Sequence, residues 1–367
     1  MKVLGIETSC DECAAAVVED GKVILSNVVA TQIPFHSVYN GVVPEIASRM
    51  HTEWINRVVQ EALDKASLKI DDIDATAATA HPGLLGSLLV GLSFAKAFAW
   101  ARGIPFIAID HMLAHLYAPI LVYKTENNIS NETILNESIT YPFLGLLVSG
   151  GHTIICRADN FDDITVLGTT IDDAAGEAFD KVSKHYGFGY PGGAAIDKLA
   201  AGGDAGAFNF PMPNLYKGDH RYDVSYSGLK TAVVNQLEQF RAGRSGKKDT
   251  GRSGDKNGKP PDYSPADLAA SFQKTAVDIL LRSLFRAAED TGLSTIVAGG
   301  GVAANSRLRA ALAERKDLRC IFPPLELCGD NGAMVAGLAF KYLSRGERSS
   351  LRATASARVR SFKRRYP

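Results

Sequence analysis

The side chains with the clearest chemical potential are two histidines, His111 and His115, separated by three residues. Residues four apart on a helix share a face, with Cβ atoms about 5–6 Å apart, a separation that suits one metal ion. The pair follows segment 104–110, which we expect to be a strand, and ligands gather at the carboxyl ends of strands in α/β sheets. Histidines at this spacing are more often plain surface or core residues, so the motif alone does not establish a metal site. Because Met112 stands where a zinc peptidase needs glutamate, we reject a protease.

Three glycine-rich turns could bind an anionic ligand: residues 149–153 (SGGHT), 190–193 (YPGG) and 298–305 (AGGGVAAN). Backbone N–H groups in such turns approach a phosphate closely, and the third turn also opens a helix whose N-terminus favours an anion. The first turn is equally compatible with a plain hairpin. The third turn lacks the lysine of a Walker A loop and does not fit the G-x-G-x-x-G spacing, so neither nucleotide motif applies to it.

Acidic residues form two groups in the sequence: Glu7, Asp11 and Glu12, and Asp173, Glu177 and Asp180. Asp330 is a further acidic candidate that stands alone. The second group shares one helical face, which is usually a solvated face, although the neighbouring Ala, Gly and Phe suit a packed helix beside a cleft. Asp330 opens a helix, where an aspartate is most often an N-cap, and a carboxylate ligand is the alternative. A lone Cys10-x-x-Cys13 pair gives little support for zinc or redox chemistry.

The elements that position these residues read as an α/β protein. Strands are expected at 2–9, 21–32, 73–80 and 104–110, and helices at 44–66 and 84–102. The Asp20-Gly21 turn predicts that the first two strands form a hairpin. A strand, glycine turn and strand recur at 141–158, and a strand, glycine turn and helix follow at 294–312. Two halves that both begin with turn-linked strands predict a duplicated α/β unit.

Length and composition place limits on the protein class. A chain of 367 residues is too long for one ordinary core, so two lobes are expected. Hydrophobic residues make up 46% and charged residues 22%, which excludes a chain disordered throughout. No run of eighteen apolar residues, signal peptide or transit segment is seen. Five cysteines in a chain of this size favour a reducing compartment, and we expect a cytoplasmic protein.

The net charge of zero conceals an uneven distribution. Residues 341–367 hold nine basic residues and one acidic residue, so the rest of the chain carries a charge of −8. A second block, 241–259, holds seven basic and two acidic residues. Such segments are either solvated extensions or contacts for a polyanion such as RNA. Segments 123–140 and 243–261 are rich in small polar residues, and we expect them to be mobile surface insertions.

Eight motifs stand in the order found in one family: GIETSCDE, HMLAH, LLVSGGHT, IDDAAGEAFDK, YPGG, YSGLKT, AGGGVAAN and CGDNGAM. From residue 1 to about 345 the chain resembles the bacterial tRNA N6-adenosine threonylcarbamoyltransferase family, formerly called O-sialoglycoprotein endopeptidases. The resemblance implies the actin/Hsp70/sugar-kinase fold, in which two related α/β lobes enclose a cleft. One lobe would comprise 1–110 and about 331–345, the other 111–330, with a basic tail at 346–367.

The resemblance also implies an activity: transfer of a threonylcarbamoyl group from threonylcarbamoyl-AMP to N6 of adenosine 37, in tRNAs reading codons that start with A. The implied metal ligands are His111, His115 and Asp330, for iron or else zinc. The implied substrate-binding residues are Leu147, Val148, Ser149, Gly150, Gly151, Asp180, Gly193, Asp197 and Asn305. The implied partners are tRNA, a homologous non-catalytic subunit and a small ATPase, and ATP or ADP is an alternative ligand.

The chemistry agrees with that implication. An exocyclic adenine amine is a poor nucleophile, so it needs an acyl donor with a good leaving group such as AMP. We expect Asp11 or Glu12 to take the N6 proton. The chain departs from the family at Cys13, usually Thr, at His81, usually Gly, and in its long 243–261 loop. A sugar or carboxylate kinase would not need the histidine pair, and a non-catalytic binding lobe is expected to lack it.

Overall fold

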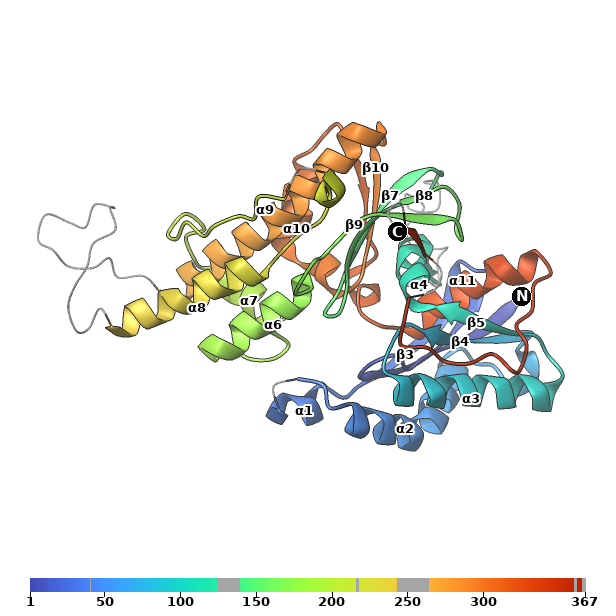
Figure 1. The fold of residues 1–367 in the computed structure, drawn as a ribbon. Coiled ribbons are helices and arrows are strands. Elements are labelled where there is room, and N and C mark those ends of the chain that lie inside the picture. Colours follow the sequence, from blue (N-terminus) through green and yellow to red (C-terminus); the bar gives the residue numbers. More distant parts are fainter. Residues whose placement is uncertain (40, 125–138, 216–217, 243–263, 360–361, 365–367) are drawn as a thin grey trace, which may run out of the picture.

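A computed structural model describes residues 1–39, 41–124, 139–215, 218–242, 264–359 and 362–364 (Figure 1). The insertions expected at 123–140 and 243–261 fall mainly on 125–138 and 243–263, which lie outside the described residues. Two six-stranded sheets organise the chain. No helix in the described part of the chain is long and apolar enough to span a bilayer.

The first sheet has the strand order β5-β4-β1-β2-β3-β6. Its strands are β1 (Lys2–Glu7), β2 (Glu12–Glu19), β3 (Val23–Thr31), β4 (Ala75–His81), β5 (Phe106–Asp110) and β6 (Val122–Tyr123). β1, β2 and β3 are antiparallel neighbours, whereas β4 is parallel to β1 and β5 is parallel to β4. The carboxyl ends of β1, β4 and β5 therefore meet at one edge of this sheet.

The second sheet has the order β11-β10-β7-β8-β9-β12, which repeats the first strand by strand. Its strands are β7 (Phe143–Val148), β8 (Thr153–Ala158), β9 (Ile164–Thr169), β10 (Thr295–Gly299), β11 (Arg319–Ile321) and β12 (Phe362–Arg364). Pairing directions also repeat, with an antiparallel β7-β8-β9 meander and β10 parallel to β7. The predicted duplicated α/β architecture is confirmed.

One expectation about the first sheet is wrong. The segments at 2–9 and 21–32 were expected to pair with each other across the Asp20-Gly21 turn. Instead β2 lies between them, pairing with both β1 and β3. Its core residues, 13–18, are apolar without alternation and are buried on both faces of the sheet. A central strand covered on both sides lacks the period-2 pattern that identifies a half-buried strand.

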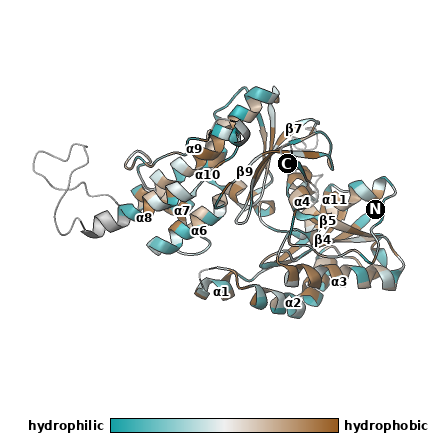
Figure 2. Ribbon diagram, viewed as in Figure 1, coloured by the Kyte–Doolittle hydropathy of each residue, from teal (hydrophilic) through white to brown (hydrophobic). Residues whose placement is uncertain are grey.

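Helices form three layers around the two sheets (Figure 1). α2 (Pro44–Lys65) and α3 (Leu85–Arg102) cover the outer face of the first sheet, and short α1 (Ile33–His36) precedes them. α4 (His111–Tyr117) and α11 (Gly332–Ser344) lie between the sheets and share one hydrophobic core with both. The second sheet's other face packs on the remaining helices: α6 (Ala175–Tyr186), α7 (Gly192–Ala200), α8 (Ser227–Ala242), α9 (Pro265–Thr291) and α10 (Ser306–Ala313). The strands and the inner sides of these helices are hydrophobic, and hydrophilic residues face outward (Figure 2).

Small residues let α11 rest directly on the first sheet. A Cβ added at Gly5 would lie 2.4 Å from the carbonyl oxygen of Gly332, so any larger residue there would push the helix away. A Cβ at Gly332 would in turn lie 2.6 Å from the backbone nitrogen of Ala16. This close approach fixes the N-terminal end of α11 beside the carboxyl end of β1.

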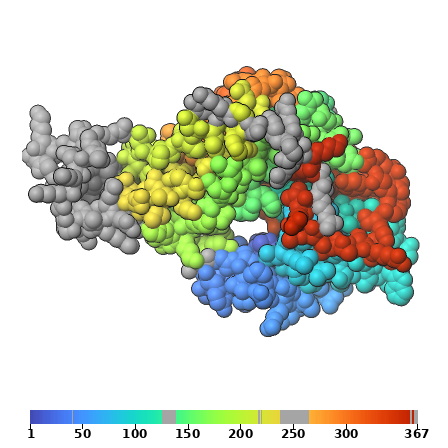
Figure 3. Space-filling view, viewed as in Figure 1, coloured from blue at the N-terminus to red at the C-terminus, as the bar shows by residue number. Residues whose placement is uncertain are grey.

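The described part of the basic tail links the two sheets and is not a free extension. The backbone nitrogen of Ser349 donates to Phe106 O (2.8 Å), and that of Ser356 donates to Ala80 O (2.9 Å), both in the first sheet. The chain then adds β12 to the edge of the second sheet beside β9. Figure 3 shows this terminal segment crossing one face of the molecule. The lobe boundaries expected from the sequence stay a prediction.

Candidate functional site

α4 carries both histidines because Asp110 ends β5 and begins the helix. Its Oδ1 accepts hydrogen bonds from the backbone nitrogens of Met112 (2.8 Å) and Leu113 (3.2 Å), which caps the first turn. The imidazole rings of His111 and His115 then lie on one face, with centroids 4.5 Å apart. The expected helix, starting directly after the strand, is thus present.

Asp330 reaches the histidines because its neighbour provides the cap of α11. Asn331 Oδ1 accepts from the backbone nitrogen of Met334 (3.0 Å), and Asn331 Nδ2 donates to Gly329 O (2.9 Å). The expectation that Asp330 is most often the N-cap is therefore wrong for this helix. Its carboxylate is free to point across the cleft toward α4, which corresponds to the alternative of a ligand.

The three side chains converge on one point between the sheets. Asp330 Oδ1 lies 3.2 Å from His115 Nε2 and 3.5 Å from His111 Nε2, and one potential ligand atom from each residue falls within 4.8 Å of the others. On its other side, His111 Nδ1 lies 3.0 Å from Glu7 Oε2. A carboxylate behind a ligand histidine is the usual support for a metal-binding imidazole. Two imidazole nitrogens and one carboxylate in this arrangement fit a divalent transition metal.

The charges around these groups favour a cation. Burial lowers the pKa of His111, but the carboxylates of Asp330 and Glu7 outweigh burial and raise it to about 9. Burial and the neighbouring His111 lower the pKa of His115. Burial raises the pKa of Asp330, but the two histidines outweigh it and hold the pKa well below its usual range. His115 Nδ1 is buried without a hydrogen-bond partner among the described residues.

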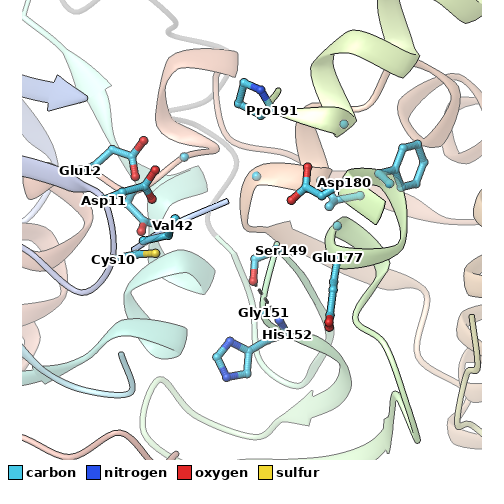
Figure 4. Close-up of a pocket in the computed structure, with 18 of the residues that line it drawn as sticks. Cys10, Asp11, Glu12, Val42, Ser149, Gly151, His152, Glu177, Asp180 and Pro191 are labelled. Atoms are coloured by element: carbon cyan, nitrogen blue, oxygen red, sulfur yellow. Dashed lines mark hydrogen bonds between the residues drawn. The ribbon is translucent and has the colours of Figure 1, made fainter. Parts of the chain in front are cut away.

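A cleft of about 910 Å³ opens beside this cluster, and loops and helices that accompany both sheets line it (Figure 4). Small-molecule sites commonly measure roughly 300–1,000 Å³. The lining residues that the sequence singled out are Asp11, Glu12, His111, Ser149, Gly150, Gly151, Glu177, Asp180, Gly193, Asp197, Asn305 and Asp330. The structure therefore brings most of the expected site residues to one place.

Backbone atoms of glycines form much of the cleft wall opposite Asp11 and Glu12. No heavy atom lies within 4 Å of a Cβ built on Gly150, Gly151, Gly193 or Gly301, so these residues leave open space over the cleft. At the neighbouring Gly192 an added Cβ would lie 2.6 Å from Asp180 Cα. The lining glycines leave room for a ligand to approach the backbone.

Three expected polar residues brace this wall. Asp180 Oδ1 accepts from the backbone nitrogen of Gly192 (2.7 Å), which holds the N-terminus of α7. Asp197 accepts from Gln273 Nε2 and from Ser306 Oγ (2.7 Å), so it ties α7 to α9 and α10. Asn305 caps α10 by accepting from the Leu308 nitrogen (3.0 Å).

Three expected residues lie elsewhere. The side chains of Leu147 and Val148 are buried in the hydrophobic cores on the two faces of β7 and are absent from the described cleft lining. Asp173 precedes α6 and does not continue its acidic face; it pairs with Lys181 and Lys230, 2.6 Å away in each case. These two ion pairs account for an acidic residue at position 173, so no role for it in the cleft is needed.

Asp11 and Glu12 form an acidic pair where the loop between β1 and β2 meets β2, and both line the cleft. Burial, followed by the charges of Asp11 and Asp330, raises the pKa of Glu12 to about 9, and Thr31 Oγ1 lies 3.3 Å from Glu12 Oε1. Glu12 therefore holds a proton at neutral pH when no cation is nearby. Burial likewise raises the pKa of the Cys10 thiol.

Several lining residues had no assigned role in the sequence interpretation: Cys10, Val42, His152, Tyr190 and Ala357. His152 belongs to the recognised SGGHT motif, so the motif itself was a signal for it. Val42 and Ala357 carry no chemical signal, because an apolar side chain lines a cleft only through the path of the chain. Figure 4 shows Val42 beside Cys10 and Asp11 on one wall, facing Asp180 and Glu177 on the other.

Most of the chain matches one known protein family. The family TsaD, tRNA N6-adenosine threonylcarbamoyltransferase, matches residues 23–337. A curated protein of that name from Treponema denticola is 60% identical over 362 residues, covering 99% of this chain and 98% of the relative. The Treponema pallidum subsp. pallidum protein of the same name is 51% identical, covering 100% of this chain and 95% of the relative.

Solved structures resemble the fold at low sequence identity. Component A of (R)-2-hydroxyglutaryl-CoA dehydratase from Acidaminococcus fermentans has a TM-score of 0.51 at 14% identity, covering 94% of this chain and 99% of that one. Full-length HypF in its phosphate- and nucleotide-bound form has a TM-score of 0.53 at 14% identity, covering 93% of this chain and 46% of that one. These likenesses concern the fold alone. The expected actin/Hsp70/sugar-kinase type is confirmed.

Proposed function

The chain belongs to the tRNA N6-adenosine threonylcarbamoyltransferase family and is a transferase, and from this premise we propose how its cleft performs the reaction. The acceptor is N6 of adenosine 37 in tRNAs that read codons starting with A, and the donor is threonylcarbamoyl-AMP. The observation that carries the proposal is the convergence of His111, His115 and Asp330 at one end of a cleft lined by open glycines. A metal site facing an anion-binding backbone suits an acyl-adenylate.

The adenylate occupies the wall formed by the second sheet and its helices. Gly150 and Gly151 follow β7, and Gly193 lies in the first turn of α7, and the open space over all three lets the donor approach the backbone of two elements. Helix N-termini and glycine turns favour the phosphate's negative charge. Asp197 and Asn305 hold α7 and α10 together beside it. ATP or ADP would fit the same wall as an alternative ligand.

His111, His115 and Asp330 would hold one divalent ion per chain, iron as first choice and zinc as second. When bound, such an ion supplies Lewis-acid stabilisation of negative charge on donor oxygens. Glu7 orients His111 from behind, and the histidine pair keeps the Asp330 carboxylate ionised. A kinase on the same fold would not need this cluster.

The acidic pair, Asp11 and Glu12, supplies proton transfer. The adenine amine loses a proton as it attacks the carbamoyl carbon and AMP departs, so a nearby carboxylate must accept that proton. Asp11 and Glu12 both line the cleft, so either carboxylate is in position to accept it. Unchanged product formation by an Asp11→Ala, Glu12→Ala double variant would remove this assignment.

The tRNA contacts the basic tail beside the cleft. Ala357 lines the cleft, and the exposed Arg352 and Arg358 flank it on the segment that crosses between the sheets. Phosphates of the anticodon stem would meet these guanidinium groups while an unstacked base enters the cleft. A homologous non-catalytic subunit and a small ATPase complete the assembly in the cytoplasm.

The decisive experiment combines this protein, the corresponding subunit and ATPase of its own organism, threonylcarbamoyl-AMP and unmodified tRNA, followed by mass spectrometry of the digested nucleosides. The expected result is threonylcarbamoyl-adenosine at position 37 alone. A reaction that yields only nucleotide hydrolysis or a phosphorylated small molecule would contradict the proposal and favour a kinase.

A further inference from the structure

A group of buried polar side chains lies behind the Cys10–Glu12 loop and has no part in the proposed chemistry. Gln32 follows β3, His36 ends α1, and His51 lies within α2. All three are 0% exposed, although two of them are titratable. A buried polar group without a hydrogen bond destabilises the fold, so the loss of any one of these contacts should disturb the segments that they join.

The three side chains form one continuous hydrogen-bonded chain between two backbone groups. The backbone nitrogen of Val43 donates to His36 Nδ1 (3.3 Å), and His36 Nε2 donates to Gln32 Oε1 (3.1 Å). Gln32 Nε2 donates to His51 Nδ1 (3.4 Å), and His51 Nε2 donates to Cys10 O (2.9 Å). The chain therefore begins at an N–H group and ends at a carbonyl.

The backbone groups fix every proton in this chain. Val43 N–H is only a donor, so His36 Nδ1 must be an acceptor and the proton of a neutral ring lies on Nε2. Gln32 Nε2 also donates to the carbonyl of Ala47 (3.4 Å), which sets the amide orientation. Cys10 O is only an acceptor, so His51 also carries its proton on Nε2. A second proton on either ring would place two donors face to face.

Both ends of this chain reach the cleft. Gly41 and Val42 line it on one side, and Cys10 begins the loop that presents the acidic pair. The backbone nitrogen of Gln32 additionally donates to Asp11 O (3.0 Å), so two successive carbonyls of that loop are held from behind. Figure 4 shows Val42 next to Cys10 and Asp11 on this wall.

We propose that His36, Gln32 and His51 form a relay that fixes Gly41–Val43 relative to the acidic pair and are positioning residues for the transfer. The inference rests on the proposed function, because it assumes that Asp11 and Glu12 act on the acceptor. None of the three is among the described lining residues, so they act through the backbone they hold. Burial lowers the pKa of His51, which agrees with a neutral ring in this position.

Two substitutions of His51 separate positioning from simple packing. Glutamine places its amide nitrogen where Nε2 stands and keeps the donor to Cys10 O, whereas asparagine is one methylene shorter and reaches only the Nδ1 position. We expect His51→Asn to lower kcat about tenfold or more and His51→Gln to lower it less than about threefold. The KM for threonylcarbamoyl-AMP should change less than about threefold in both, because the adenylate contacts the other wall.

Steady-state kinetics of the full assembly and thermal melting of each variant provide the measurement. His185→Asn, on the exposed part of α6, is the matched control and should leave kcat unchanged. Equal kcat values for the two His51 variants would overturn the relay. A KM that rises in proportion to the fall in Tm across the variants would also overturn it, because that result indicates general loss of packing.

Nitrogen-15 NMR of the histidines in the wild-type protein tests the relay without any activity. We expect His36 and His51 as neutral rings protonated at Nε2, and a ring protonated at Nδ1 would overturn the proposed chain. If the wild-type assembly modifies no tRNA, the proposed function fails, and the observed tautomers still decide for or against the relay.

Discussion

The Nε2 atom of His115 lies 3.2 Å from the Oδ1 atom of Asp330, although the two residues are 215 positions apart in the chain. One sits on α4, after the last long strand of the first sheet, and the other precedes α11, after the second sheet is nearly complete. Both helices lie in the layer that the two sheets share. The contact therefore depends on how the duplicated halves pack together.

Removal of Asp330 should abolish metal binding and leave the fold intact. We expect the wild-type protein to retain about one ion per chain and Asp330→Ala to retain less than about a tenth of that, because two imidazoles alone hold a divalent ion weakly. Plasma mass spectrometry of purified protein measures this. His220, whose Nδ1 lies 2.8 Å from Asp223 Oδ2 at an exposed turn, is the matched control, and His220→Ala should keep its metal. Full retention by Asp330→Ala would refute the proposed ligand set.

Adjacent glycines on α7 should respond in opposite ways to the same substitution. Gly193→Ala places a methyl group in open space over the cleft, so Tm should be unchanged or slightly higher while the KM for the donor rises several-fold. Gly192→Ala drives its Cβ to within 2.6 Å of Asp180 Cα, so Tm should fall, by an amount corresponding to about 1–3 kcal/mol. Calorimetry and donor titration distinguish the two. A fall in Tm without a change in KM for Gly193→Ala would contradict the open-wall interpretation.

Glu12→Gln should stabilise the protein at alkaline pH. The folded protein raises the pKa of Glu12 from 4.5 to about 9, so it binds this proton more tightly than the unfolded chain does. Stability is therefore lost as pH rises through that window, and glutamine removes the loss. In chelator-treated protein, the variant's advantage should be larger at pH 8 than at pH 5, by up to about 4 kcal/mol. Melting curves at both pH values test the sign, and an advantage that is larger at pH 5 would contradict it.

Charge reversal on the tail should weaken tRNA binding without affecting the donor. Arg352 and Arg358 are exposed, and neither has an acidic partner among the described residues, so the double variant Arg352→Glu, Arg358→Glu should leave Tm unchanged. Each lost phosphate contact lowers the slope of log K against log salt by about 0.7–0.9. Filter binding at several salt concentrations measures the slope. Lys316→Glu, at the exposed turn after α10, is the control, and equal effects of both changes would remove the tail as a tRNA contact.

Much of the site was recoverable from local sequence because its parts are local motifs. The strand followed by His111 and His115, the SGGHT turn and the glycines before Asn305 each combine a strand end with a turn, and strand ends share an edge in such sheets. Their placement around one cleft is therefore what the motifs predict. The charge of the tail was equally evident, since it needs only counting.

Other features were beyond local interpretation. β2 has no alternating pattern because both its faces are covered, so its place between β1 and β3 was missed. Asn331 is the N-cap of α11, because the helix begins one residue later than expected. The Asp330 side chain is therefore not used in capping and can reach the histidines. Leu147 and Val148 belong to a lining motif, yet their strand position turns both side chains into the cores.

The motifs and their order were enough to indicate the family and the duplicated fold, because each motif is a set of residue types at short spacing. The candidate ligand set followed from the resemblance to that family. Tertiary structure alone decided that Asp330 meets His115, that His36, Gln32 and His51 connect the two ends of one wall, and that the tail spans both sheets. Each of these contacts joins segments from separate elements. Their distances are set by how the sheets and helices pack, which short-range patterns do not encode.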